Sequence, residues 1–134
     1  MALKASQLKV GDTHKECVVE NLSRTQLVMY SGAGGDYNPL HTDEIFTTQV
    51  AGYPSVFAHG MLTMGMTGRA LTDLVGVENL TRFGGRFTSQ VWPGDTLTAE
   101  ITVDSVDGGI AELTVSTKNQ DGVEVFSGTA AARV

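Results

Sequence analysis

The fold of this chain is decided by residues 58–76, which read AHGMLTMGMTGRALTDLVG. The spacing predicts the longest helix of the chain from Gly60 to Val75, with apolar residues on most of its circumference. Gly65 and Gly68 lie inside it, and each costs about 1 kcal/mol relative to alanine in a helix. This cost indicates that another element packs close to the helix backbone, as a sheet wrapped around it would.

Strand patterns flank the helix on both sides. Turn signals at 93–95, 107–109 and 120–122 separate the later strands and predict antiparallel neighbours in a four-stranded meander. We therefore predict an α+β fold with one domain over residues 1–134, in which a curved antiparallel sheet wraps around one long central helix. The predicted strands are 15–22 before the helix, and 82–92, 96–106, 110–118 and 123–134 after it.

Composition excludes several kinds of partner. A net charge of −6 and a pI of about 4.8 leave no basic stripe for nucleic acid or for an anionic membrane surface. No apolar run reaches the roughly 20 residues that span a bilayer. The first 11 residues lack the apolar stretch of a signal peptide, and Cys17 is the only cysteine. We therefore expect a cytoplasmic protein without an intrachain disulfide.

The residues that carry chemistry gather between two predicted helices. The first helix is capped by Ser23 or Thr25 and ends in the glycines of 32–35, while Thr42 is the expected N-cap of a second, short helix to about Val50. The connection between them, residues 35–41, reads GDYNPLH. It forms a shaped loop, because a proline restricts its own backbone and that of the residue before it.

Asp36 and His41 lie on this loop, five residues apart. A carboxylate and an imidazole held together can bind a water molecule and exchange protons with it. An Asp-x-Asn-Pro element alone is more commonly a turn with a side-chain-to-backbone bond. The presence of His41 in the same loop, and of His59-Gly60 at the start of the long helix, favours a catalytic interpretation.

At these motifs the chain resembles the MaoC-like, (R)-specific enoyl-thioester hydratases and dehydratases, which have the hot-dog fold. The resemblance covers nearly the whole chain, and the continuation at 62–65 is also similar to the catalytic subunit of mycobacterial-type (R)-3-hydroxyacyl carrier-protein dehydratases. The chain departs from the family pattern at Ala33 and Thr47. Both departures are mild and lie outside the proton-handling groups. The motifs that carry it are Tyr30 with 35–41, 58–61, and Phe87 with 91–95.

The resemblance implies a set of site residues. Asp36 and His41 would bind the reacting water, and the backbone N–H of Gly60 would hold the thioester oxygen as negative charge develops on it. A helix N-terminus suits the latter role because its first N–H groups are free and its potential is positive. Residues expected to line or support the substrate pocket are Tyr30, Asn38, His59, Met61 and Met64.

The implied reaction is the hydration of trans-2-enoyl thioesters of coenzyme A or acyl carrier protein, or the reverse dehydration, in fatty-acid metabolism. The resemblance also implies that two hot-dog sheets pair edge to edge, in a homodimer or with a different hot-dog subunit. We expect no metal and no cofactor. Two alternatives remain open: a hot-dog acyl thioesterase, and a non-catalytic acyl-binding partner subunit of a heteromeric dehydratase. Acyl chain length and physiological direction are not encoded in any motif.

Overall fold

The computed structural model describes residues 7–134, so the expectation about the first 11 residues falls partly outside the described chain. Its helical elements are α1 (Arg24–Gly34), η2 (Pro39–His41), η3 (Phe46–Val50) and α2 (Gly60–Val75). Its strands are β1 (Thr13–Val19), β2 (Leu80–Phe87), β3 (Leu97–Asp107), β4 (Ile110–Lys118) and β5 (Glu124–Arg133). Within this part of the chain, no helix combines the length and apolarity needed to cross a membrane.

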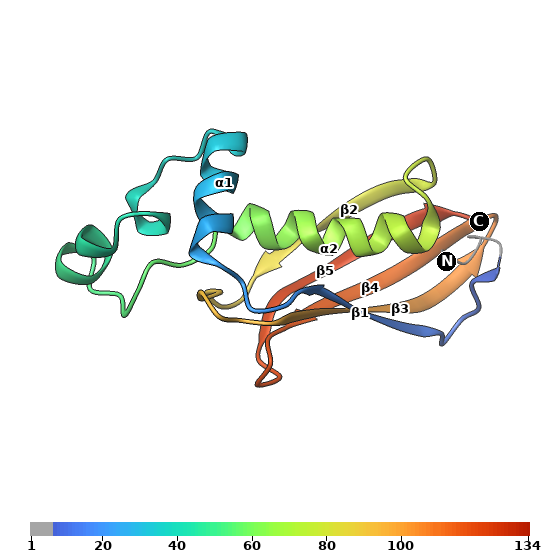
Figure 1. Ribbon diagram of the computed structural model, residues 1–134. Helices are drawn as coiled ribbons and strands as arrows, with labels where there is room; N and C mark the ends of the chain where they lie inside the picture. The colour runs from blue at the N-terminus through green and yellow to red at the C-terminus, as the bar shows by residue number, and fades with distance from the viewer. Residues whose placement is uncertain (1–6) are drawn as a thin grey trace.

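The strands form one antiparallel sheet in the order β1-β3-β4-β5-β2, and α2 lies across one face of it (Figure 1). The predicted α+β class, with a sheet and a central helix, is confirmed. The meander is correct for β3, β4 and β5 but wrong for the first of its four strands. β2 lies at the far edge and pairs with β5.

Two contacts between distant parts of the chain accompany this strand order. Gly85 stands opposite Gly128, and a Cβ on either glycine would collide with backbone of the other strand, so β2 and β5 are matched by their glycines. The turn at 93–95 does not make a hairpin. Its Gly94 and Asp95 exchange backbone hydrogen bonds with Leu22, at 2.7 and 2.9 Å, so the turn joins β3 to the segment that follows β1.

The long helix buries one face only. A Cβ on Gly68 would lie 3.2 Å from the Phe83 ring, so the predicted close packing is present there. At Gly65 the prediction is wrong for this chain alone, because a Cβ would meet nothing within 4 Å. Met61, on the same side, is 57% exposed. The residues that α2 buries are Leu62, Thr63, Thr67, Ala70, Leu71, Leu74 and Val75.

The apolar core has two parts, and the second supports the functional end of the molecule. The first joins the C-terminal half of α2 to the centre of the sheet. The second lies beneath the start of α2. In it Leu62 of α2 packs with Leu27 of α1 and with Val56, which lies in the segment between the two helices. α1 stands crosswise beside the first turn of α2 (Figure 1). Both ends of the segment between α1 and α2 are therefore anchored in this second part of the core.

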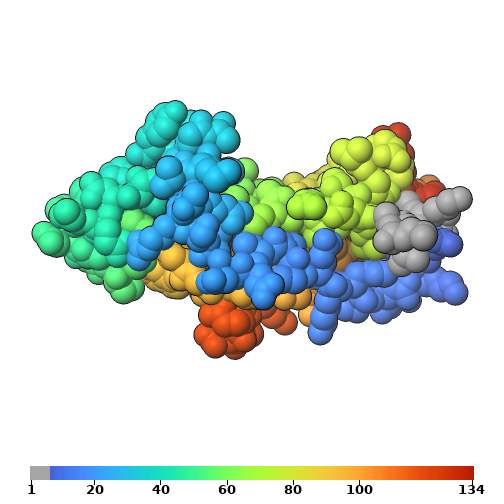
Figure 2. Space-filling view, viewed as in Figure 1, coloured from blue at the N-terminus to red at the C-terminus, as the bar shows by residue number. Residues whose placement is uncertain are grey.

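Residues 36–57 project beyond α1 as an excursion away from the sheet, and they form the lobe at the left of the space-filling view (Figure 2). Of the two caps predicted for α1, Ser23 and Thr25, the structure has Ser23, which accepts a hydrogen bond from the backbone of Gln26 at 3.0 Å. The predicted cap at Thr42 is wrong. Asp43 has that role, since its carboxylate accepts from the Phe46 backbone at 3.0 Å, and the helical turn beyond it is π-helical.

Candidate active site

The loop that carries Asp36 and His41 is shaped by short side-chain-to-backbone bonds. α1 ends at Gly35, whose positive φ of 72° places it in the left-handed region that glycine adopts most readily. Asp36 then accepts a hydrogen bond from the Asn38 backbone at 3.2 Å, and Asn38 accepts one from the Leu40 backbone at 3.0 Å. Asn38 is thereby the N-cap of η2, whose last residue is His41.

His41 is 8% exposed and has a defined orientation. Its Nδ1 lies 2.7 Å from the carbonyl oxygen of Phe57. Because a carbonyl only accepts hydrogen bonds, Nδ1 carries the hydrogen and donates it. In the neutral ring Nε2 then has a free lone pair, and it faces Oδ2 of Asp36 at 3.8 Å. Two acceptors at this separation are arranged to share the hydrogens of a small donor such as water.

His59 lies against this pair and is nearly completely buried. Its ring stacks on that of His41, with centroids 3.8 Å apart and an angle of 25°. Its Nε2 is 3.3 Å from the Asp36 backbone oxygen and 3.0 Å from Oγ of Ser31. Burial, and then the neighbouring His41, lower the pKa of His59. His59 is therefore a neutral residue that links α1, the Asp36 peptide and the start of α2.

We predict a pH dependence of stability from this buried histidine. With a folded-state pKa below the ordinary 6.5, His59 leaves stability unchanged above that pH. As the pH falls below 6.5 the unfolded chain binds the proton first, so the free energy of unfolding decreases by up to about 1.4 kcal/mol per pH unit until the folded-state pKa is reached. Urea denaturation between pH 7 and pH 5 measures this. His59→Gln should flatten the decrease, and an equally steep decrease in that variant would contradict the assignment.

The N-terminus of α2 supplies a second functional element. The structure records no acceptor, among the residues it describes, for the backbone N–H groups of Gly60 and Met61. A cavity of about 300 Å³ lies beside Gly60. A Cβ on Gly60 would lie 2.9 Å from the Phe87 ring, so any side chain at this position would have to displace that ring. The cavity is lined by Phe57, Ala58, Gly60, Thr63, residues 87–91 and Val125.

The structure brings some of the predicted site residues together and not others. Asp36, His41 and His59 form one cluster, and the Tyr30 ring contacts His59 edge-on with centroids 4.7 Å apart. Met61 and Met64 do not line the cavity, and Met61 points to solvent in this single chain.

Sequence reasoning missed two residues that touch the cluster, Ser31 and the Phe57 carbonyl. A serine in a helix and a backbone oxygen carry no motif, so only the fold could reveal them.

The three clustered residues also make a potential metal-ligand set, which the sequence did not predict. Their ligand atoms all lie within 4.8 Å of one another. Ligands of one ion must direct their lone pairs toward one point. The stacked rings of His41 and His59 instead hold their lone pairs in two nearly parallel planes, and Nε2 of His59 is engaged with Ser31 and Asp36. The arrangement suits proton handling better than metal coordination.

Comparison with known proteins identifies the family of the chain. The MaoC like domain matches residues 6–124. The 3-hydroxyacyl-thioester dehydratase Y of Mycobacterium tuberculosis is 35% identical over 116 residues, which cover 84% of this chain and 39% of that protein. The peroxisomal enoyl-CoA hydratase 2 of Arabidopsis thaliana is 34% identical over 90 residues, covering 65% of this chain and 28% of that protein. The chain thus spans well under half the length of these curated relatives.

Solved structures agree with this relationship. The (R)-hydratase of A. caviae involved in PHA biosynthesis superimposes with a TM-score of 0.83 at 25% identity, over 96% of this chain and 98% of that one. The unliganded R-hydratase PhaJ1 of Pseudomonas aeruginosa, at 23% identity, shares the fold with a TM-score of 0.86 over 97% of this chain and 84% of that one. With a family match over most of its length and hydratase structures as neighbours, the chain belongs to the MaoC-like domain family.

Proposed function

We propose that the protein catalyses the (R)-specific hydration of trans-2-enoyl thioesters and the reverse dehydration of (R)-3-hydroxyacyl thioesters. One observation carries the proposal: Nε2 of His41 and Oδ2 of Asp36 face each other at 3.8 Å, and the His41 ring stacks on His59, the residue before the free N–H of Gly60. This combination offers a place for a water molecule next to a place for a thioester oxygen. We further propose that neither a metal nor a cofactor takes part.

Asp36 and His41, here called the dyad, would activate the water. Hydration forms a bond between the water oxygen and the β-carbon, while one water proton passes to the dyad and a proton is delivered to the α-carbon. The Phe57 carbonyl, by accepting from Nδ1, keeps the lone pair of His41 at Nε2, where the water is expected. A fixed tautomer is a requirement for such a role.

The start of α2 would stabilise the charge that develops. Addition at the β-carbon moves electron density onto the thioester oxygen, and the N–H of Gly60 is expected to donate a hydrogen bond to it. The positive end of the helix dipole acts in the same direction. The 300 Å³ cavity beside Gly60 would accept part of the acyl group.

The relatives support this reaction and its substrate class. Their names include a 3-hydroxyacyl-thioester dehydratase and enoyl-CoA hydratases, which act in opposite directions on the same pair of compounds. We therefore propose a coenzyme A or acyl carrier protein thioester as substrate, and a role in fatty-acid metabolism. We propose a cytoplasmic location on a separate ground, since the single Cys17 allows no intrachain disulfide.

A direct assay tests the proposal. Hydration of crotonyl-CoA by the purified protein should remove the absorbance of the conjugated enone without releasing free thiol, and chiral analysis should identify the (R)-3-hydroxy product. Thiol release with a constant double bond would instead identify a thioesterase. No turnover, either alone or with a second hot-dog subunit, together with binding of the thioester, would identify a non-catalytic acyl-binding subunit.

We predict that the active species is at least a dimer with a sheet continuous across the interface. β2 is an edge strand, so one side of it has unpaired backbone groups available to another sheet. Met61, which is exposed, and Gly65, where a Cβ would meet no atom within 4 Å, lie on the uncovered face of α2. This face could also be covered by a second subunit. One solved neighbour is itself a complex of two chains, ChsH1 and ChsH2. Light scattering of the active protein checks this, and a fully active monomer would contradict it. Activity that requires a second hot-dog chain would favour a heterodimer.

A further inference from the structure

We propose that Glu44 is a positioning residue for the catalytic imidazole: by bonding Arg24 and the backbone of Val56, it holds the Phe57 carbonyl that orients His41. This inference rests on the proposed function, because it concerns the same dyad. Glu44 lies on the projecting excursion and is absent from the motifs that identify the family in this sequence.

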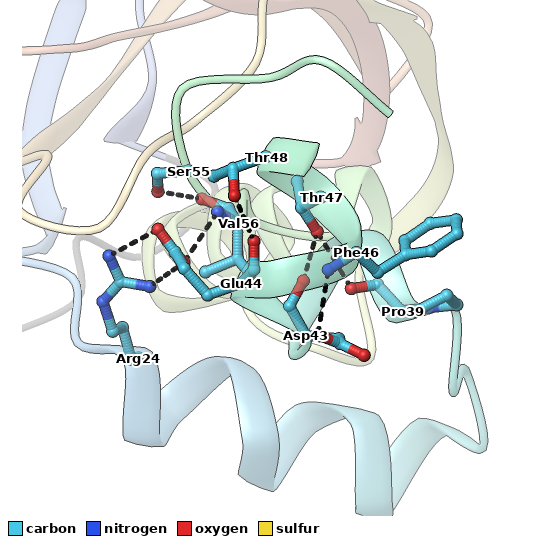
Figure 3. Close-up of polar contacts among 9 residues, drawn as sticks. All are labelled: Arg24, Pro39, Asp43, Glu44, Phe46, Thr47, Thr48, Ser55 and Val56. Carbon is cyan, nitrogen blue, oxygen red and sulfur yellow. Dashed lines mark hydrogen bonds and ion pairs between the residues drawn. The ribbon is translucent and has the colours of Figure 1, made fainter. Parts of the chain in front are cut away.

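Glu44 joins three separate parts of the chain (Figure 3). Its two carboxylate oxygens accept hydrogen bonds from the guanidinium of Arg24, the first residue of α1. One of the same oxygens accepts from the Val56 backbone N–H at 3.2 Å. The Arg24 bond, and then the Val56 bond, lower the pKa of Glu44, so the residue is ionised at neutral pH. Glu44 thereby ties the segment after His41 to residues 56–57, here called the returning segment, which lead back to α2.

The tie lies one residue from the catalytic contact. Val56 precedes Phe57, whose N–H donates to the Leu40 carbonyl at 3.2 Å and whose carbonyl accepts from Nδ1 of His41 at 2.7 Å. The returning segment is therefore held on one side by Glu44 and on the other by the loop that carries His41. A shift of Val56 would move the Phe57 carbonyl, and with it the acceptor that fixes the His41 tautomer.

The side-chain bonds of Thr47 and Thr48 in the same excursion are more local. Thr47 donates to the carbonyls of Pro39 and Asp43, and Thr48 donates to the carbonyl of Glu44 itself (Figure 3). These bonds stabilise the helical turns between 39 and 50. Among the described residues, Glu44 is the side chain whose recorded bonds reach both α1 and the returning segment.

A matched ion pair in the same molecule separates positioning from simple stabilisation. Arg82 and Glu112 also form a close guanidinium–carboxylate contact, on the sheet, with side chains 55% and 43% exposed. Arg24 and Glu44 are 55% and 45% exposed. Ion pairs this exposed contribute little to stability, so both should be similarly dispensable for folding. Only the loss of Glu44 should disturb the dyad.

The experiment compares Glu44→Met with Glu112→Met, since methionine keeps side-chain length but accepts no comparable hydrogen bond. Displacements of about 1 Å at a reacting group can cost about 10²-fold in rate, and a smaller shift should cost about 10-fold. We expect Glu44→Met to lower kcat for crotonyl-CoA hydration about 10-fold with little change in KM. Glu112→Met should stay near wild type, and Glu44→Gln, which keeps an oxygen for Val56, should recover most of the loss.

The second readout does not depend on activity. Nitrogen-15 NMR of the His41 ring, assigned with His41→Ala, should show the Nδ1–H tautomer in the wild type and in Glu112→Met, and a tautomer mixture in Glu44→Met. An unchanged ring in Glu44→Met would overturn the proposal, as would a Glu44→Met protein that unfolds while Glu112→Met folds. A wild type that hydrates no enoyl thioester would refute the proposed function, while the ring spectra would still test the role of Glu44.

Discussion

Asp36→Asn and His41→Ala should each lower the turnover of crotonyl-CoA hydration by about 10²-fold or more, as expected for general acid–base groups. Asparagine keeps an oxygen that can accept from the Asn38 backbone, so the loop retains its shape while the charge and the proton-accepting capacity are lost. His41→Ala removes the facing nitrogen. Because both groups act on one water, the turnover of the double variant should be only slightly lower than that of the less active single variant.

The chain offers a control for the carboxylate. Asp73 on α2 has a side chain 52% exposed, against 51% for Asp36, and its contact with Arg69 is a surface ion pair. Asp73→Asn should therefore leave turnover near wild type. Folding of each variant is checked by circular dichroism. Near-wild-type hydration by folded Asp36→Asn or His41→Ala would refute the dyad, and strictly additive losses would show that the two residues act in separate steps.

Gly60→Val should nearly abolish activity while the protein stays folded and assembled. Losing one donor to a developing oxyanion costs about 3–4 kcal/mol in the transition state, and a steric block at the same point should cost at least as much. The structure supplies the reason for the block. Even a single Cβ at residue 60 would lie 2.9 Å from the Phe87 ring, which also lines the cavity. Either the ring or the acyl group must then move.

Two variants make this prediction specific to Gly60. Gly65→Ala, five residues along the same helix, adds a methyl group that meets nothing within 4 Å and should stay active, provided light scattering shows an unchanged assembly. His59→Gln should be milder than Gly60→Val, because a glutamine can still donate to the Asp36 carbonyl. Kinetics on all three variants decide the matter. An active Gly60→Val protein, or an inactive His59→Gln protein, would move the oxyanion site away from this helix end.

Much of the local structure could be predicted because short-range chemistry determines it. The Ser23 cap, the glycine stop after α1, the bounds of α2 and the strand β4 follow from residues within a few positions of each element. The pairing of Asp36 with His41 also follows, since the two residues are only five positions apart on a loop that Asn38 and Pro39 shape. The α+β class follows from one strongly apolar helix followed by alternating strands.

Contacts between distant residues were decided by the tertiary structure alone. The sequence cannot state that Gly85 will face Gly128, which moves β2 to the sheet edge, because register depends on which strand the chain meets. The same holds for the stacking of His59 on His41 and for the Phe57 carbonyl at Nδ1. The sequence by itself determined the kinds of chemical group at the site. Their tautomers, their burial and the residues that hold them in place were set by packing between segments far apart in the chain.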